Sequence, residues 1–313
     1  MTCGSAIRQV KSITSNELSK PREAIKDAIS QRTASDKILP PWIVMIPFMI
    51  SIMGGTVIFA VALSKAFEYF SENNEIVDDY DFIAGSEWIL ILALAISAIF
   101  YFSYGLITYQ LIDRMNKHSA REISLRLSVS SYIETLTSSS AQGGRSELGW
   151  SWLGDQSFLS SDNVKRRSPT LWMVIIASPI IGSILQALLY FAYDYDTMSR
   201  YSLLVTAMLL IIGVFMLYLF NSLMKEIHEH DRRWIEFTRD VKVSLARAGF
   251  TAGTLPDHSL LEKRSFALYF VLSFVTMGLF MIYWWYIILK DPNDHFKKQW
   301  EFEDGLMEFI SPR

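Results

Sequence analysis

Cysteine and charged side chains are scarce in this sequence, and each scarcity excludes a class of protein. The single cysteine, Cys3, excludes an intrachain disulfide. Charged residues make up 19% of the chain, below the quarter or so found in soluble domains, and the net charge of −3 gives no sign of a nucleic-acid partner. Residues 1–40 lack the apolar core of a signal peptide, so we expect no cleaved leader.

Motifs of the common enzyme classes are missing as well. The sequence contains no Walker loop, no glycine-rich dinucleotide fingerprint, no HExxH zinc motif and no GxSxG nucleophile elbow. We therefore predict that the chain is not an enzyme, has no catalytic residues and needs no cofactor.

Long apolar runs are abundant. Hydrophobic residues reach 51% and gather in uncharged blocks. Crossing the hydrocarbon core of a bilayer takes about 20 apolar residues, so the composition predicts an all-α, polytopic transmembrane helical protein. Because no block contains an ionisable residue, a proton-driven transporter is disfavoured. The blocks are Trp42–Leu63, Trp88–Ile112, Leu171–Tyr193, Tyr201–Leu223 and Phe266–Leu289.

One short pattern occurs three times, each time after an apolar block. Every copy centres on a histidine, with Asn or His two positions before it and a basic residue three positions after it. Apolar residues then follow at the fifth, seventh and eleventh positions. The pattern predicts an internal repeat. Its copies are Asn116, His118 and Arg121; His228, His230 and Arg233; and Asn293, His295 and Lys298.

The repeat divides the chain into segments. We expect a cytoplasmic N-terminal segment (1–37) with a short surface helix over Asn16–Ser30, and a two-span repeat unit (38–137). A flexible Ser- and Gly-rich linker (138–164), a second two-span unit (165–248), a second linker (249–262) and a compressed third unit (263–313) follow.

Helical periodicity continues past the ends of two apolar blocks. Neither junction contains Pro or Gly, so we predict two uninterrupted helices, over about Glu87–Leu136 and Tyr201–Ala248, that project from the membrane. In the first block, Gly54 and Gly55 predict a bend or the close approach of a neighbouring helix.

The distribution of basic residues predicts the orientation. Residues 66–87 carry seven acids and no base, whereas residues 112–168 and 224–264 carry eight Lys or Arg each. Because Lys and Arg concentrate on the cytoplasmic side, we expect a multi-pass plasma-membrane protein with its N-terminus and both basic segments inside.

The last apolar block permits two topologies. A single span over Phe266–Leu289 would place the C-terminal tail outside. A re-entrant hairpin turning at Thr276–Gly278 would return it to the cytoplasm, where Phe302 or Leu306 would contact the apolar stripe Phe237–Val241. We favour the hairpin, because only it gives the tail's apolar residues a partner.

The same region carries a family resemblance. The stretch from Thr276 through Gly278 and Phe280 to Tyr283-Trp284, with the polar helix after it, resembles a family of uncharacterised prokaryotic membrane proteins over residues 264–310. The Asn-x-His-x-x-basic copies resemble a pattern in archaeal multi-pass proteins. No activity is known for the family, so the resemblance implies no catalytic residues.

Three interpretations of the histidines compete. Glu226 and His230, like Asp291 and His295, are four residues apart and share a helix face, as metal ligands do, but the first copy has Arg114 at the equivalent place. We therefore predict no bound metal and histidines paired with nearby acids or carbonyls at the membrane boundary. The nine residues of the copies are candidate interfacial or lipid-headgroup contacts.

The function expected from these features is non-catalytic. We predict a scaffold that interacts with partners or lipids through a cytoplasmic helical bundle; the alternative is a subunit of a channel or transporter that is not driven by intramembrane ionisable residues. The expected partners are the bilayer, anionic lipid headgroups and further copies of the same or another chain, but not nucleic acid.

Overall fold

The computed structural model describes residues 15–72, 87–140, 166–192, 195–247, 250 and 255–311. These residues form helices and connecting segments without any β-strand. Most of the predicted linker 138–164, and most of the acidic segment 66–87, lie outside the described residues.

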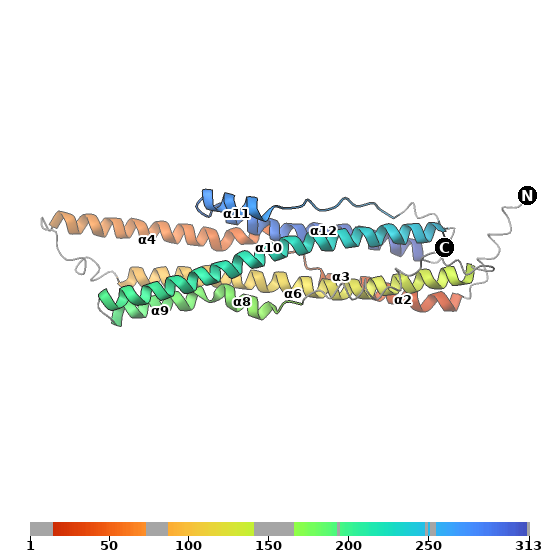
Figure 1. Cartoon of the computed structure of the whole chain (residues 1–313), viewed down its shortest axis with the longest axis horizontal. Coiled ribbons are helices and arrows are strands. Elements are labelled where there is room, and N and C mark those ends of the chain that lie inside the picture. Colours follow the sequence, from red (N-terminus) through yellow and green to blue (C-terminus); the bar gives the residue numbers. More distant parts are fainter. Residues whose placement is uncertain are drawn as a thin grey trace, which may run out of the picture.

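The helices lie side by side in an elongated bundle (Figure 1). Two of them, α6 and α10, run most of its length, and the shorter helices line its two halves. In chain order the helices are α2 (Ser15–Ser30), α3 (Arg32–Ser35), η2 (Pro41–Val44), α4 (Met45–Glu72), α6 (Glu87–Ser140), α8 (Pro169–Ala177), α9 (Pro179–Ala192), α10 (Tyr195–Arg247), α11 (Phe266–Val275) and α12 (Phe280–Ile310).

The two long helices confirm the prediction of uninterrupted helices through both junctions. α6 has 54 residues and α10 has 53. At 1.5 Å of rise per residue each is about 80 Å long, far more than a bilayer needs. Each therefore has an apolar part and a polar part that projects beyond it.

One half of the molecule is apolar on its outside. We call it the apolar half; it comprises α4, α8, α9, α11 and the first parts of α6 and α10. Three described helices, over Pro41–Lys65, Trp88–Leu136 and Thr206–Ala246, are long and apolar enough to cross a membrane. Large apolar side chains such as Phe59 and Leu203 point outward there, which suits lipid and indicates a membrane protein.

The apolar block at Leu171–Tyr193 is not one helix. Ser178 separates α8 from α9, and Pro179 begins the second helix. A proline removes one backbone N–H donor and its ring collides with the carbonyl four residues earlier, so the helix breaks before it.

The last apolar block is also divided, at the turn expected for a hairpin. α11 ends at Val275, Met277 and Gly278 have φ angles of 50° and 90°, and α12 begins at Phe280. The Tyr269 ring lies 5.2 Å from the Phe280 ring across the turn. α11 stops well short of the end that α4 and α9 reach (Figure 1), so the hairpin enters only part of the apolar half.

The turn returns α12 to the other half of the molecule, which we call the polar bundle. It is formed by α2, α12 and the second parts of α6 and α10. The predicted tail contact is present: Phe302 and Leu306 share a buried core with Phe237 and Val241. The ring of Trp234 lies 5.6 Å from that of Phe302.

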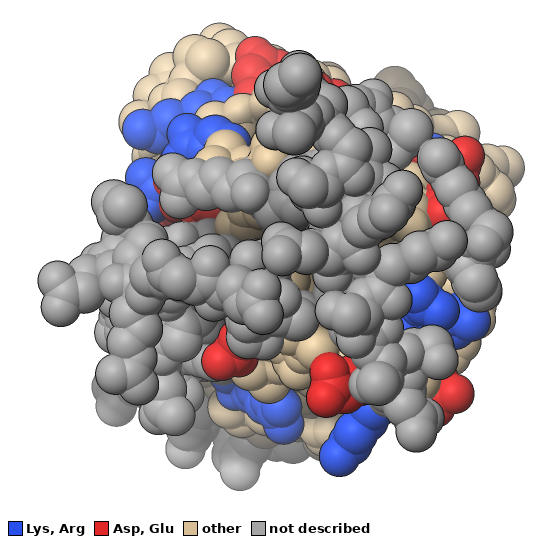
Figure 2. Space-filling model, turned by 90° about the vertical axis from the view of Figure 1, so that its right-hand side faces the viewer, with Lys and Arg blue, Asp and Glu red and all other residues tan. Residues whose placement is uncertain are grey.

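The N-terminal helix differs from the expectation. α2 covers the predicted Asn16–Ser30, but Ile25, Ala28 and Ile29 are buried in the core of the polar bundle. It is therefore a fourth helix of the bundle rather than a helix on a membrane surface, because its apolar stripe packs against protein instead of lipid. Viewed from the end of the polar bundle, described Lys, Arg, Asp and Glu side chains of both signs lie at the surface (Figure 2).

Candidate metal centre

Three histidines from three helices meet where the apolar half joins the polar bundle. His118 comes from α6, His230 from α10 and His295 from α12, and their exposed fractions are 0%, 4% and 0%. Nε2 of His118 lies 3.2 Å from Nε2 of His230. The ring centroids of His295 lie 5.3 Å from His118 and 4.8 Å from His230. The central residues of the three sequence copies are thus brought together.

A fourth group completes the cluster. Oε2 of Glu122 lies 2.8 Å from Nε2 of His230 and 3.3 Å from Nε2 of His118. One ligand atom from each of the four residues lies within 4.8 Å of all the others. A tetrahedral ion with bonds of about 2.0–2.2 Å separates its ligand atoms by roughly 3.3–3.6 Å. Small side-chain adjustments would therefore let the four groups bind one ion.

Two buried carboxylates fix the orientation of two of the rings. Nδ1 of His118 donates to Oδ1 of Asp36 at 2.9 Å, and Nδ1 of His295 donates to Oδ1 of Asp231 at 2.8 Å. An ionised carboxylate can only accept a hydrogen bond, so in each neutral ring the proton sits on Nδ1 and the lone pair on Nε2. Metal-binding histidines usually have such carboxylate partners.

Neighbouring charges keep Asp36 ionised, whereas burial keeps His295 neutral. Burial would raise the pKa of Asp36, but the hydrogen bond and charge of His118 and the charge of Arg121 outweigh it and hold that pKa well below its usual range. Burial lowers the pKa of His295 to about 4. His295 is therefore neutral at pH 7, which is the form that binds a metal.

Two arginines neutralise the acids around the centre. Arg126 forms an ion pair with the other oxygen of Glu122. Arg121 links Asp36 and Glu303, with contacts of 2.6 Å to each. Burial raises the pKa of Glu303, although Arg121 opposes this. These arginines balance the charge of the buried carboxylates.

The residues two positions before each histidine bind backbone. Asn116 donates to the carbonyl of Arg167 at 2.8 Å, just before α8. Asn293 donates to the carbonyl of Leu39 at 2.6 Å, just before η2. His228 Nδ1 lies 3.1 Å from the carbonyl oxygen of Leu261, in the segment leading to α11. Each copy thus holds the segment that leads into a different apolar helix.

The headgroup interpretation does not apply to the most buried of the nine predicted residues. Five are enclosed by protein, where no lipid headgroup reaches them in this conformation. Contact with headgroups stays a prediction for the other four, which are half-buried. The five are His118, Arg121, His230, Asn293 and His295; the four are Asn116, His228, Arg233 and Lys298.

The predicted pairing of the histidines with acids is present, whereas the expectation that they bind no metal is untested. Arg114, the residue that argued against a metal ion, makes its hydrogen bonds to groups outside the cluster. Its guanidinium donates to the carbonyls of Lys37 and Leu289 and to Oδ1 of Asn293. Arg114 thereby joins α6 to the segment before η2 and to α12, on the side of the cluster that faces the apolar half.

Sequence reasoning missed Glu122 and Asp36. Glu122 follows His118 by four residues, the spacing that was considered only for Glu226 and Asp291, so a signal was available. Asp36 lies 82 residues before His118, and no local pattern links the two.

Comparison with known proteins gives one match. The model of a family described as a domain of unknown function (DUF4234) matches residues 264–310, which span α11, the turn and α12 and include His295. This is the range over which the sequence resembles an uncharacterised family. The archaeal origin and the motifs of that resemblance stay predictions. The comparisons with curated proteins and with solved structures found no match.

Proposed function

We propose that this protein is a membrane metalloprotein that binds one divalent transition-metal ion through His118, His230, His295 and Glu122. The ion ties α6, α10 and α12 together where the apolar half meets the polar bundle. Three imidazoles and one carboxylate, without a thiolate, suit zinc, iron, manganese, cobalt or nickel.

One observation carries the proposal: three imidazoles and a carboxylate converge on one point, and the lone pair of His295 Nε2 has no partner among the described residues. The Nδ1 protons of His118 and His295 are committed to Asp36 and Asp231, so both Nε2 lone pairs point at the cluster. Among the described residues, Nε2 of His295 has no hydrogen-bond partner. Buried acceptors that face each other and a carboxylate repel, and burying an unsatisfied polar group costs roughly 1–3 kcal/mol. A cation in the middle removes this cost.

Extra protons are the alternative to a metal ion. A second proton on His118 would lie between its Nε2 and Glu122, 3.3 Å away. That arrangement makes a polar core without metal and leaves Nε2 of His295 unpartnered. A metal ion satisfies all four groups and would displace such protons on binding.

The role in the cell follows from the architecture. We infer a multi-pass protein of the plasma membrane with a cytoplasmic N-terminus, in which the repeat units set three histidines around the ion. The polar bundle then serves as a scaffold for partners or lipid headgroups, either as a homo-oligomer or with another chain. The absence of Asp, Glu, Lys, Arg and His from the five apolar blocks disfavours a proton-driven transporter, and a channel or transporter subunit not driven by intramembrane ionisable residues stays the alternative.

Metal analysis of the full chain, purified in detergent, tests the proposal. We expect one transition-metal ion per chain, and loss of that ion in His230→Ala and in Glu122→Ala. His228→Ala is the matched control: it removes a histidine two residues from His230 that binds a backbone carbonyl, so the ion should remain. Metal-free protein that also takes up no zinc, iron or cobalt on titration would refute the proposal.

A further inference from the structure

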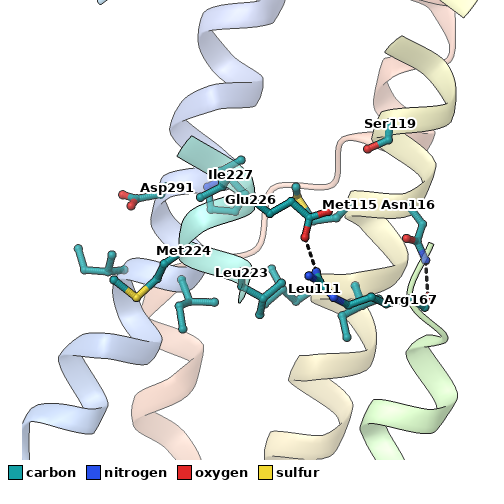
Figure 3. Close-up of a pocket in the computed structure, with 14 residues that line it drawn as sticks. Leu111, Met115, Asn116, Ser119, Arg167, Leu223, Met224, Glu226, Ile227 and Asp291 are labelled. Carbon is teal, nitrogen blue, oxygen red and sulfur yellow. Dashed lines mark hydrogen bonds and ion pairs between the residues drawn. The ribbon is translucent and has the colours of Figure 1, made fainter. Parts of the chain in front are cut away.

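A pocket lies between α6, α10 and α12, and several of its lining residues precede the four candidate ligands by about one helical turn on these helices. Its free volume is about 20 Å³, enough for one water-sized molecule. Figure 3 shows the lining side chains converging from the three helices, with Arg167 and Glu226 paired on one side. The residues that touch the pocket include Met115, Ser119 and Ile227.

The pocket is one helical turn from the ligands on all three helices. Glu226 and Ile227 precede His230 by four and three residues, and Asp291 and Pro292 precede His295 by the same spacings. On α6 the pocket residues Met115 and Ser119 precede the two ligands by three. Every ligand therefore lies on the same helix face as a pocket residue, one turn closer to the C-terminus of that helix.

The ligand side chains lean toward this pocket. α6, α10 and α12 all run from the apolar half into the polar bundle. Side chains on a helix point back toward its N-terminus, and here that direction is toward the pocket on all three helices. An ion held by four such side chains would have its protein ligands toward the polar bundle, which would leave the side toward the pocket free.

The lining of the pocket indicates what enters it. Most of the lining is hydrocarbon or thioether, from residues such as Leu111, Leu223 and Ile287. The charged lining groups are already paired, Arg167 with Glu226 at 2.5 Å and Asp291 with Arg264 at 3.4 Å. Apart from the ion itself, an anion would thus meet apolar surface and no unpaired cation in the pocket lining, at a large desolvation cost.

We propose that the bound ion keeps an open coordination position toward this pocket and that the pocket admits a small uncharged molecule, such as a diatomic gas, to the ion. This rests on the proposed function, because it needs the ion. The molecule binds as a ligand of the metal and is not transformed. The centre thereby binds small neutral ligands in addition to joining α6, α10 and α12.

Nitric oxide is a suitable probe, because its complex with high-spin iron(II) has a characteristic electron paramagnetic resonance spectrum. The full chain, loaded anaerobically with iron(II), should give that spectrum on addition of nitric oxide. Azide, an anion of similar size, should not change the iron(III) spectrum. Ile227→Phe fills the pocket and should weaken nitric oxide binding about tenfold or more with iron content unchanged.

Two further variants keep the test decisive. Ile227→Ala enlarges the pocket and should bind nitric oxide at least as tightly, which covers the case in which Ile227→Phe does not fold. Ile25→Phe places the same overpacking in the polar bundle, away from the pocket, and should leave the spectrum unchanged. Iron-loaded wild type without a nitrosyl spectrum, or with tight azide binding, would overturn this inference alone. A chain that binds no ion would overturn the proposed function with it.

Discussion

His118, His230 and His295 share one sequence pattern, yet each has a different acidic partner in the structure. Asp36 orients the first, Glu122 contacts the second and Asp231 orients the third. The pattern predicted an internal repeat with a histidine at the centre of each copy. It could not predict that their Nε2 atoms converge, because helix periodicity gives the face of a residue and not the helix that covers it.

Removing the charge of Asp36 should weaken metal binding without removing a ligand. In Asp36→Asn the amide can still pack in the same place, but it no longer fixes the proton of His118 on Nδ1 or makes the ring more basic. We expect the metal affinity to fall about 10- to 100-fold, as is typical when a residue that hydrogen-bonds a metal ligand is changed. Competition with a chromophoric chelator measures it.

A matched change on the surface serves as the control for this prediction. Asp113→Asn likewise removes one negative charge, here from α6. In the contacts described, Asp113 pairs only with the exposed Lys117. Its metal affinity should equal that of the wild type. Equal affinities for Asp36→Asn and Asp113→Asn would show that Asp36 does not support the centre.

At the scale of whole elements, much of the fold was predictable. The periodicity of α6 and α10 continues without Pro or Gly, and therefore both helices were predicted through their junctions. The turn before α12 was predictable from Gly278, whose φ of 90° favours glycine. The docking of α2 was not, because an amphipathic stripe suits a lipid surface as well as a protein core.

The contact between α4 and α6 depends on one of two adjacent glycines. A Cβ atom at Gly54 would lie 2.2 Å from Cδ1 and 2.9 Å from Cγ1 of Ile96, whereas a Cβ atom at Gly55 would meet nothing within 4 Å. Gly54→Val should therefore destabilise the protein by about 1–3 kcal/mol through overpacking. Thermal unfolding in detergent measures the loss.

Gly55→Val provides the internal comparison, because the change in helix propensity is the same at both positions. It should unfold within a few degrees of the wild type, since a surface substitution typically changes stability by less than about 0.5 kcal/mol. Similar losses for the two variants would show that α4 does not pack on α6 through Gly54.

The whole molecule consists of an apolar half and a polar bundle with the candidate metal centre at their junction. Apolar length predicted the first half, and the shared stripes of Phe237, Val241 and Phe302 predicted part of the second. The centre itself required the hairpin, since only a returning α12 brings His295 to the other two histidines. Only the uneven distribution of Lys and Arg predicts which side of the membrane the polar bundle occupies.

Labelling of single cysteines in intact cells tests both the sidedness and the hairpin. On a Cys3→Ser background, Arg232→Cys in α10 and Asp304→Cys in α12 place thiols at exposed positions of the polar bundle. An impermeant maleimide should label both only after lysis, because basic segments stay in the cytoplasm, while Asn74→Cys in the acidic segment should react in intact cells. If both bundle cysteines reacted in intact cells, the orientation would be reversed and the fold retained. If only Asp304→Cys reacted, α12 would end on the opposite side from α10, and neither the hairpin nor the three-histidine centre could exist.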